Sequence, residues 1–307
     1  MGEYVFDQSW ASAYERTGRR YYPKLVSCSP FSPVSGPRLL VSPAAPPGTA
    51  AALGRGITAV ADALQLSSAH VTFPTAADAA QLTGEGWMLR TGLQYHWQNR
   101  GYSSFADFEA ALVQKRRKVV RQERKKAQEG LRLRRLRGSE ITSAHWDAFY
   151  DFYVDTADRK YGRAYLTREF FARLGETMGD AVLLVTAEEA EPGGGPIIAA
   201  ALNLCGSDAL FGRNWGCQGE RPFLHMEVCY YQAIEEAIER KLGRVEAGAQ
   251  GEHKIARGYD ATPTYSAHYI RDPGFRASVA DFLRRETEQM AEVISELRAG
   301  SPYKEEA

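Results

Sequence analysis

The pattern of apolar and polar residues along the chain predicts helices that alternate with strands. Helices are expected at residues 49–66, 76–82, 105–129, 224–240 and 275–297, and strands at residues 69–73, 87–98, 131–136, 181–187, 197–204, 209–215, 244–247 and 264–270. Thr142 or Ser143 and Thr167 suit the caps of two further helices. Prolines between residues 23 and 47 confine regular structure there to short pieces. The mixture of predicted helices and strands indicates a protein of the α/β (α+β) class.

The predicted elements group into two units on either side of a basic helix. A chain of 307 residues is long enough for two domains. The first unit closes near residue 112, and the helix after it ends at Gly130, which suits a C-cap. The second unit has the order β-α-α-β-β-β-α-β, followed by a loop, a strand and a helix. We therefore expect domains at residues 1–112 and 131–307, joined by a linker helix at residues 113–130.

Charge is balanced over the whole chain but unevenly placed. The chain has 38 Lys and Arg against 38 Asp and Glu. Residues 115–137 contain twelve Lys or Arg and two Glu, which makes this stretch +10 and the remainder −10. Such an asymmetry predicts either an anionic partner for the basic segment or an acidic surface within the protein that it covers.

Several classes of protein are disfavoured. No apolar run approaches the length of a membrane span, and the N-terminus lacks the layout of a signal peptide, so we expect a soluble cytoplasmic protein, or an organelle stroma if the natural N-terminus is missing. The four cysteines form no C-x-x-C pair and the six histidines no i,i+4 pair. No metal site and no tightly bound cofactor are therefore predicted.

Several blocks of sequence resemble the FemAB-like, peptidoglycan biosynthesis or recognition family of the GNAT acyltransferase superfamily. They include Leu210-Phe-Gly-Arg-Asn-Trp-Gly-Cys217, Phe223-Leu-His-Met-Glu227, Glu246-Ala-Gly-Ala-Gln-Gly-Glu-His-Lys-Ile-Ala-Arg-Gly258 and Pro263-Thr-Tyr-Ser-Ala-His268. The resemblance implies two GNAT-like domains in tandem, joined by the basic helix. Family members usually carry further residues before Tyr4, so the first domain is expected to be incomplete at its N-terminus.

The resemblance also implies where acyl transfer takes place. In Fem-like sequences an acidic residue ends a strand, and a Gly-rich loop and a Lys follow; here these resemble Glu246, Gly251 and Lys254. Glu246 is a candidate to orient or deprotonate an amine, or else forms a salt bridge to the basic helix or Arg257. Lys254 is a candidate to hold a phosphate or carboxylate, or else is a solvated loop lysine. His253 is a candidate proton shuttle, or else is structural.

Further residues of the same blocks are candidates for substrate binding. Glu227 and His225 lie at the start of the predicted central helix, where Glu227 alternatively serves the helix dipole. Asn214 can present a polar group to a ligand or lie at a solvated edge. The complete set of candidates is Asn214, Trp215, His225, Glu227, Gln250, Gly251 and Arg257.

The acyl donor is less clearly indicated. Residues 218–224 place Arg221 and Phe223 where CoA-binding GNAT proteins have the glycines that hold the pyrophosphate, which disfavours CoA. Fem-type enzymes use aminoacyl-tRNA, and the basic segment can neutralise RNA phosphates. It can equally be a solvated face or a clamp, and no aromatic residues interleave its charges. The candidates for nucleic-acid contact are Lys115, Arg116, Arg117, Lys118 and Arg121.

Three functions follow from these observations. The first is an acyltransferase or aminoacyltransferase that moves an acyl group from aminoacyl-tRNA or acyl-CoA to an amine-bearing small molecule or peptide. The second is a non-catalytic GNAT-like module that recognises a peptide, a glycan or nucleic acid. The third is an RNA-associated structural protein that uses the basic helix. The sequence specifies no oligomeric state.

Overall fold

The computed structural model describes residues 2–304, apart from the side chains of residues 160 and 161. The chain forms two compact units: unit 1 comprises the chain up to Gln94 with Thr262–Arg298, and unit 2 comprises Tyr95–Ala261 with the chain from Ala299. Strands β3 (Met88–Gln98) and β9 (Asp260–Ile270) pass from one unit to the other. This division differs from the expected domains 1–112, 113–130 and 131–307, because β9 pairs with β2 of unit 1 and the basic helix belongs to unit 2.

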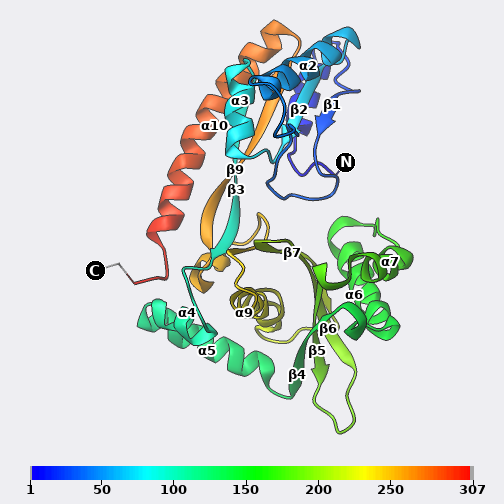
Figure 1. Cartoon of the computed structure of the whole chain (residues 1–307), viewed down its shortest axis with the longest axis vertical. Coiled ribbons are helices and arrows are strands. Elements are labelled where there is room, and N and C mark those ends of the chain that lie inside the picture. Colours follow the sequence, from blue (N-terminus) through cyan, green and yellow to red (C-terminus); the bar gives the residue numbers. More distant parts are fainter. Residues whose placement is uncertain (1, 305–307) are drawn as a thin grey trace. The chain divides into compact units, whose positions relative to one another are not determined.

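Unit 1 is a sheet with helices on both faces (Figure 1). Its strands lie in the order β1-β2-β9-β3, where β1 (Leu25–Ser27) is parallel to β2 (Ser68–Thr72) and β9 is antiparallel to β2. The helices are α1 (Gln8–Glu15), α2 (Thr49–Ala63), α3 (Ala76–Gly84) and α10 (Pro273–Ala299). Alternate residues of β2 and β9 face opposite sides, as the pleat of a strand requires.

The face of unit 1 covered by α2 and α3 is apolar. Ala69 and Val71 of β2 and Ala267 of β9 pack there against Ala61 and Leu82 of the two helices. The N-cap Thr75 begins α3 by accepting a hydrogen bond from the Asp78 backbone N–H. The alternating residues that the sequence predicted as a buried strand therefore form the core of this face.

The opposite face, covered by α1 and α10, contains a buried polar network. Nδ1 of His70 lies 2.7 Å from Nδ1 of His268, and their Nε2 atoms lie 2.8 Å from the hydroxyls of Ser68 and Ser266. Asp7 lies 3.5 Å from Nε2 of His70. Burial lowers the pKa of His70 to about 3 and that of His268 well below its ordinary value. His268 is thus a buried core residue with hydrogen-bond partners on both ring nitrogens.

Unit 2 follows the element order predicted for the second domain. Its strand order is β3-β8-β7-β6-β5-β4, antiparallel except for the parallel pair β7 and β8. The elements are α4 (Phe105–Ala111), α5 (Gln114–Gln128), β4 (Leu131–Arg137), α6 (Ser143–Tyr161), α7 (Arg168–Met178), β5 (Val182–Glu189), β6 (Ile197–Cys205), β7 (Ala209–Cys217), α8 (Leu224–Met226), α9 (Gln232–Glu239) and β8 (Arg244–Glu246). Short 3₁₀ helices occupy Gly138–Glu140, Gly179–Ala181 and Glu252–Arg257.

Helices α6 and α7 cover one face of the unit 2 sheet, and their aromatic residues fill its core. Trp146, Phe149 and Phe171 pack on Leu184 and Leu202 of the strands. Helix α6 approaches β7 so closely that a Cβ at Gly216 would lie 2.5 Å from the carbonyl oxygen of Phe152. A side chain at residue 216 would therefore push α6 off the sheet.

The single helix expected at residues 105–129 is two helices, α4 and α5. The break falls at Leu112 and Val113, where Leu112 bridges to Tyr303 and the Val113 N–H donates to the carbonyl oxygen of Pro302. The backbone groups that would continue the helix are therefore bonded to the C-terminal segment of unit 2. Helix propensity alone does not reveal that these backbone groups bond to another segment and so end the first helix.

Acid is expected to destabilise unit 1 through His70 and His268. The folded state keeps both rings neutral, whereas unfolded histidines bind protons below about pH 6.5. The free energy of unfolding therefore falls as the pH drops from about 6.5 toward the folded pKa, by about 1.4 kcal/mol per pH unit for each histidine. Hydrogen exchange of the β2 and β9 amides between pH 7 and pH 5 measures this loss. The double variant His70→Gln, His268→Gln should flatten the pH dependence, and an equally steep dependence would contradict the assignment.

Candidate functional site

Strands β7 and β8 of unit 2 pair only where they begin. Ala209, Leu210 and Phe211 lie opposite Arg244, Val245 and Glu246, and the pairing ends there. Strand β7 continues to Cys217 along β6, with an irregularity in register between Leu202 and Asn203. From Gly212 onward, one edge of the β7 backbone is therefore not paired with β8. In open α/β sheets, ligands bind at such openings beyond the carboxyl ends of parallel strands.

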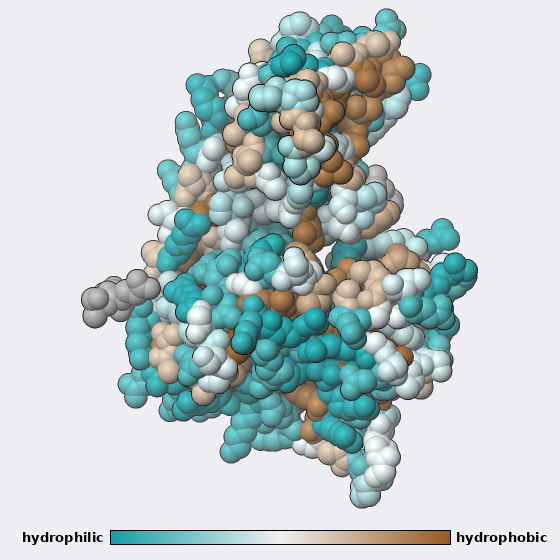
Figure 2. Space-filling model, in the orientation of Figure 1, coloured by the Kyte–Doolittle hydropathy of each residue, from teal (hydrophilic) through white to brown (hydrophobic). Residues whose placement is uncertain are grey.

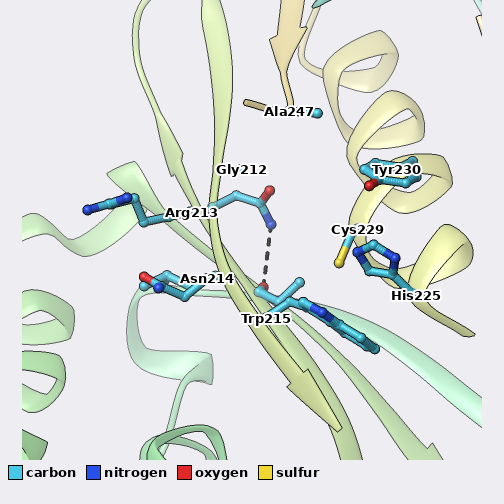
Figure 3. A pocket seen from close by; sticks show the side chains of 11 residues that line it. Gly212, Arg213, Asn214, Trp215, His225, Cys229, Tyr230 and Ala247 are labelled. Atoms are coloured by element: carbon cyan, nitrogen blue, oxygen red, sulfur yellow. Dashed lines mark hydrogen bonds between the residues drawn. The ribbon is translucent and has the colours of Figure 1, made fainter. Parts of the chain in front are cut away.

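A pocket of about 120 Å³ lies at this opening. In Figure 3, Trp215 of β7 faces His225, Cys229 and Tyr230 of the central helix, whereas Arg213 and Asn214 point away from that helix. The structure therefore brings three residues predicted from sequence, Asn214, Trp215 and His225, to one pocket. Its complete lining is Ala201, Leu202, Asn203, Gly212, Arg213, Asn214, Trp215, His225, Cys229, Tyr230 and Ala247.

The central helix contains an irregular turn at the pocket. Helix α8 leads into a π-helical turn at Glu227–Tyr231, and α9 follows it. Two pocket residues, Cys229 and Tyr230, lie in this turn. Turns of this kind are rare and are frequent at functional sites. The sequence analysis did not identify Cys229 and Tyr230, although Cys229 follows His225 at the i,i+4 spacing that places two side chains on one helix face.

Lys254 is buried beside the pocket, with 3% of its surface exposed. Its Nζ donates to the carbonyl oxygen of the pocket residue Ala247 at 2.6 Å and lies 3.4 Å from that of Gly248. The rings of Tyr95 and Tyr230 lie 5.4 and 5.7 Å from Nζ. Burial lowers the pKa of Lys254 to about 8. The alternative of a solvated loop lysine is therefore excluded.

Glu246 ends β8, immediately before the pocket residue Ala247. Its Oε1 accepts a hydrogen bond from Arg244 at 2.9 Å, and its Oε2 lies 3.8 Å from Nε2 of His96 and has no hydrogen-bond partner among residues 2–304. Burial raises the pKa of the Glu246 carboxyl, and Arg244 opposes the rise. Glu246 is thus paired with Arg244, and neither with the basic helix nor with Arg257. Arg244 and His96 were not identified from the sequence.

Glu227 is fully buried but does not line the pocket. Its carboxylate accepts hydrogen bonds of 2.8 to 3.2 Å from Arg124, Gln128 and Gln232. Arg124 also bonds to Glu235 at 2.8 Å. Glu227 therefore clamps the basic helix α5 to the central helix, which corrects its predicted roles as a substrate ligand or as a partner of the helix dipole.

The other candidates lie in the segment after β8. Arg257 forms a bidentate pair with Glu123 of α5 at 2.6 and 3.0 Å, so it is part of the scaffold. Nε2 of the exposed His253 lies 3.4 Å from the hydroxyl of Tyr230, at the edge of the pocket. Gly251 has a φ of +99°, a conformation that favours glycine, and Gln250 is exposed beside it. None of these four residues lines the pocket.

Helix α5 presents its basic side chains in two directions. Arg124 and the acidic Glu123 point into unit 2, where they form the ion pairs described above. Lys115, Lys118, Arg121 and Lys125 are exposed, and of these Arg121 bonds to Glu109 at 2.8 Å. Arg116 and Arg117 are half-buried. Figure 2 shows hydrophilic residues over this side of unit 2.

Residues 2–304 contain neither a metal-binding cluster nor a membrane-spanning helix. No group of three or more His, Cys, Asp or Glu side chains in that part of the chain is arranged to hold a metal ion. Among the helices of the same residues, none is long and apolar enough to cross a membrane.

The fold is a mixed α/β fold. The chain resembles the C-terminal domain of a putative lysylphosphatidylglycerol synthetase from Agrobacterium fabrum, with a TM-score of 0.52, 11% identity and coverage of 78% of this chain and 77% of that one. It also resembles L-PGS from Bacillus licheniformis, with a TM-score of 0.54, 10% identity and coverage of 75% and 76%. For FemX the TM-score is 0.50, the identity 10% and the coverage 75% and 78%. At these identities the likeness shows the fold.

The sequence itself identifies the family. The chain belongs to the FemAB-like family, described as peptidoglycan biosynthesis/recognition, whose sequence model matches residues 1–305. No curated protein matches the sequence significantly.

Replacing Glu227 by Gln should strongly destabilise unit 2. The change removes the buried charge that compensates the half-buried Arg124, and breaking a buried pair costs about 3 kcal/mol or more. Glu235→Gln is the matched control, because Glu235 bonds to the same arginine from a partly exposed position and its loss should cost less than about 1 kcal/mol. Urea unfolding measures both free energies. Equal losses of unfolding free energy in the two variants would show that the burial of Glu227 does not increase its contribution to stability.

Proposed function

We propose that unit 2 transfers an acyl or aminoacyl group from an activated donor to the amine of a small molecule or peptide. The observation that carries the proposal is the pocket at the divergence of β7 and β8, with the buried Lys254 behind its wall. Acyl transfer requires a held carbonyl, stabilisation of the charge that develops on its oxygen, and a group that accepts the amine proton. Unit 2 offers a candidate for each requirement.

The unpaired edge of β7 from Gly212 is the candidate that holds the carbonyl group. Backbone N–H groups at such an edge are fixed donors, and fixed donors stabilise a developing oxyanion without reorganisation. Lys254 adds a positive charge in a region from which water is largely excluded, where electrostatic interactions are stronger than in water. Lys254 therefore stabilises negative charge in the transition state.

Glu246 is the candidate that accepts the proton of the amine. One carboxylate oxygen is held by Arg244, and the other is buried without a hydrogen-bond partner in the described chain, so it can still accept a hydrogen bond or a proton. The raised pKa of this carboxyl makes it a better base than an exposed glutamate. His253, at the edge of the pocket, is placed to pass the proton to solvent.

The proposed donor is an aminoacyl-tRNA. The exposed lysines of α5 supply positive charge for phosphates, and the loop at residues 218–223 lacks the glycine pattern that holds the pyrophosphate of CoA. The family's description supports an amine-bearing peptide as acceptor. Acyl-CoA is the alternative donor that the assay must include.

Substituting Lys254 by Met should lower kcat/KM by about 100-fold, because one preorganised charge contributes on the order of 2.7 kcal/mol to such a transition state. The assay follows labelled amino acid from charged tRNA, and labelled acetyl from acetyl-CoA, to a peptide with a free lysine amine. Lys241→Met, at an exposed lysine, is the matched control and should retain full activity. Salt-dependent binding of the RNA or the peptide without turnover of either donor would instead establish a binding module.

Reversing the exposed charges of α5 should weaken RNA binding. In the variant Lys115→Glu, Lys118→Glu, Lys125→Glu, the dependence of log affinity on log salt should become shallower by about 0.7 to 0.9 for each lost phosphate contact. Filter binding of bulk tRNA between 50 and 200 mM salt, about the range over which such contacts are lost, measures the slope. Arg284→Glu, Arg285→Glu on α10 of unit 1 is the control. An unchanged slope in the α5 variant would exclude α5 as the RNA site.

A further inference from the structure

Two buried oxygen atoms beside the opening between β7 and β8 lack hydrogen-bond partners. Within residues 2–304, neither Oδ1 of Asn214 nor Oε2 of Glu246 accepts a hydrogen bond. Asn214 lies on β7 and lines the pocket, and Glu246 ends β8. A buried acceptor without a donor costs free energy, which a bound molecule with N–H groups recovers. These two unpartnered oxygens therefore indicate a ligand that donates hydrogen bonds.

The register of the strands places both side chains on the same face of the sheet. Glu246 lies opposite Phe211 of β7, and Phe211 lies opposite Leu204 of β6. Leu202, two residues before Leu204, lies opposite Asn214. Side chains of paired residues point to the same side, and so do those of residues two apart on one strand. The two unpartnered oxygens thus flank the opening on the face that α6 and α7 cover, where Leu202 packs.

A β-bulge adds a positive charge to this face. The consecutive residues Leu202 and Asn203 of β6 lie opposite Asn214 and Gly212 of β7. Arg213 is therefore the extra residue of a bulge. In a regular strand, Arg213 and Asn214 would face opposite sides, whereas Figure 3 shows both pointing away from the central helix. Bulges re-aim side chains in this way next to active sites.

The loop between α6 and α7 borders Arg213. Nη2 of Arg213 donates to the hydroxyl of Tyr165 at 3.3 Å. The backbone N–H groups of Tyr165 and Leu166 donate in turn to the hydroxyl of the buried Tyr153, at 3.1 and 3.2 Å, which holds this loop. A guanidinium carries five N–H donors in a planar fork that matches a carboxylate. Arg213 beside the two unpartnered oxygens therefore suits a molecule that carries both a carboxylate and a donor group.

We propose that Asn214 and Glu246 hold the amine of the acceptor and that Arg213 holds a carboxylate of the same molecule, which deepens the proposed function and rests on it. The acceptor is then an amino acid or the carboxyl-terminal residue of a peptide. An alkylammonium has three N–H donors, enough for both unpartnered oxygens, and the carboxylate of Glu246 supplies the opposite charge. The other face of β7, where Trp215 meets His225, is left for the acyl donor.

Three probes separate the two groups that this subsite binds. N-acetyl-Ala-Lys has one amine and one carboxylate, its carboxamide lacks the carboxylate, and its Nε-acetyl derivative lacks the amine. In isothermal titration calorimetry, wild-type protein should bind each modified peptide about tenfold more weakly than the parent, because a hydrogen bond to a charged group is lost. Arg213→Met should abolish the preference for the carboxylate and keep the preference for the amine. Asn214→Leu should reduce the preference for the amine and keep that for the carboxylate.

Two further variants and one stability measurement separate binding from a structural role. Arg173→Met, at an exposed arginine of α7, is the matched control for the lost charge and should bind all three peptides as wild-type protein does. Asn214→Asp keeps an acceptor oxygen and should restore the preference for the amine. In urea unfolding without ligand, the midpoint of Asn214→Leu should rise, because the change removes a buried oxygen that has no partner. A structural Asn214 would make the same variant less stable.

The subsite is overturned if wild-type protein binds the three peptides equally or does not bind N-acetyl-Ala-Lys. It is also overturned if Asn214→Leu loses stability and keeps its preference for the amine. Calorimetry needs no acyl donor, so its result does not depend on the proposed function. If the peptides bind with the expected preferences and neither charged tRNA nor acetyl-CoA supports turnover, the subsite stands and acyl transfer fails. If N-acetyl-Ala-Lys and its carboxamide are acylated with equal kcat/KM, the transferase stands and the carboxylate subsite is overturned.

Discussion

Two buried carboxylates, Glu123 and Glu227, hold together the parts of unit 2 that surround the pocket. Glu227 joins the central helix to Arg124 of α5, and Glu123 of α5 bonds in return to Arg257 and to Tyr231 of the central helix. A charge taken out of water is tolerated only while its partners stay in place, so these pairs fix the geometry of the elements that carry them. The basic helix is therefore part of the scaffold of the site.

The same constraint explains the uneven charge of the chain. Arg124 is neutralised by acidic residues of the central helix, and Arg134, Arg135 and Arg137 of β4 bond to Glu188, Glu236 and Glu239. Much of the positive charge between residues 115 and 137 is thus balanced inside unit 2. What remains for an external anion is the outer face of α5, with its exposed lysines.

Lys254 contrasts with these paired charges. Its ammonium has carbonyl oxygens and aromatic rings as partners and, within residues 2–304, no carboxylate at salt-bridge distance. Burial of such a charge costs free energy and lowers the pKa of Lys254. Strongly perturbed groups beside a pocket are typical of functional sites. The structure thus separates a scaffold of paired charges from a pocket that lies beside a buried charge without a carboxylate partner.

Local patterns in the sequence determined most of the elements, because periodicity and caps act within a few residues. The unit 2 order, the α6 and α7 caps and the burial of β2 were all predictable in this way. Three features depended on contacts between residues far apart in the sequence. Strand β9 pairs with β2 in the sheet of unit 1, and the helix expected at residues 105–129 is interrupted at Leu112. Glu227 forms an ion pair with Arg124, which lies 103 positions away in the sequence.

The candidate site, too, could be predicted from the sequence only in part. The resemblance of the blocks around Asn214, His225 and Lys254 pointed to the region where the pocket lies, but the contacts of Glu227 and Arg257, and the presence of Asn203, Cys229 and His96, required the folded chain. Periodicity tells which face of an element is buried and leaves open which element covers that face. The sequence by itself therefore determined the fold class and family, and only the tertiary structure decided which side chains meet at the pocket, because that choice rests on packing and buried charge pairing between segments far apart in the chain.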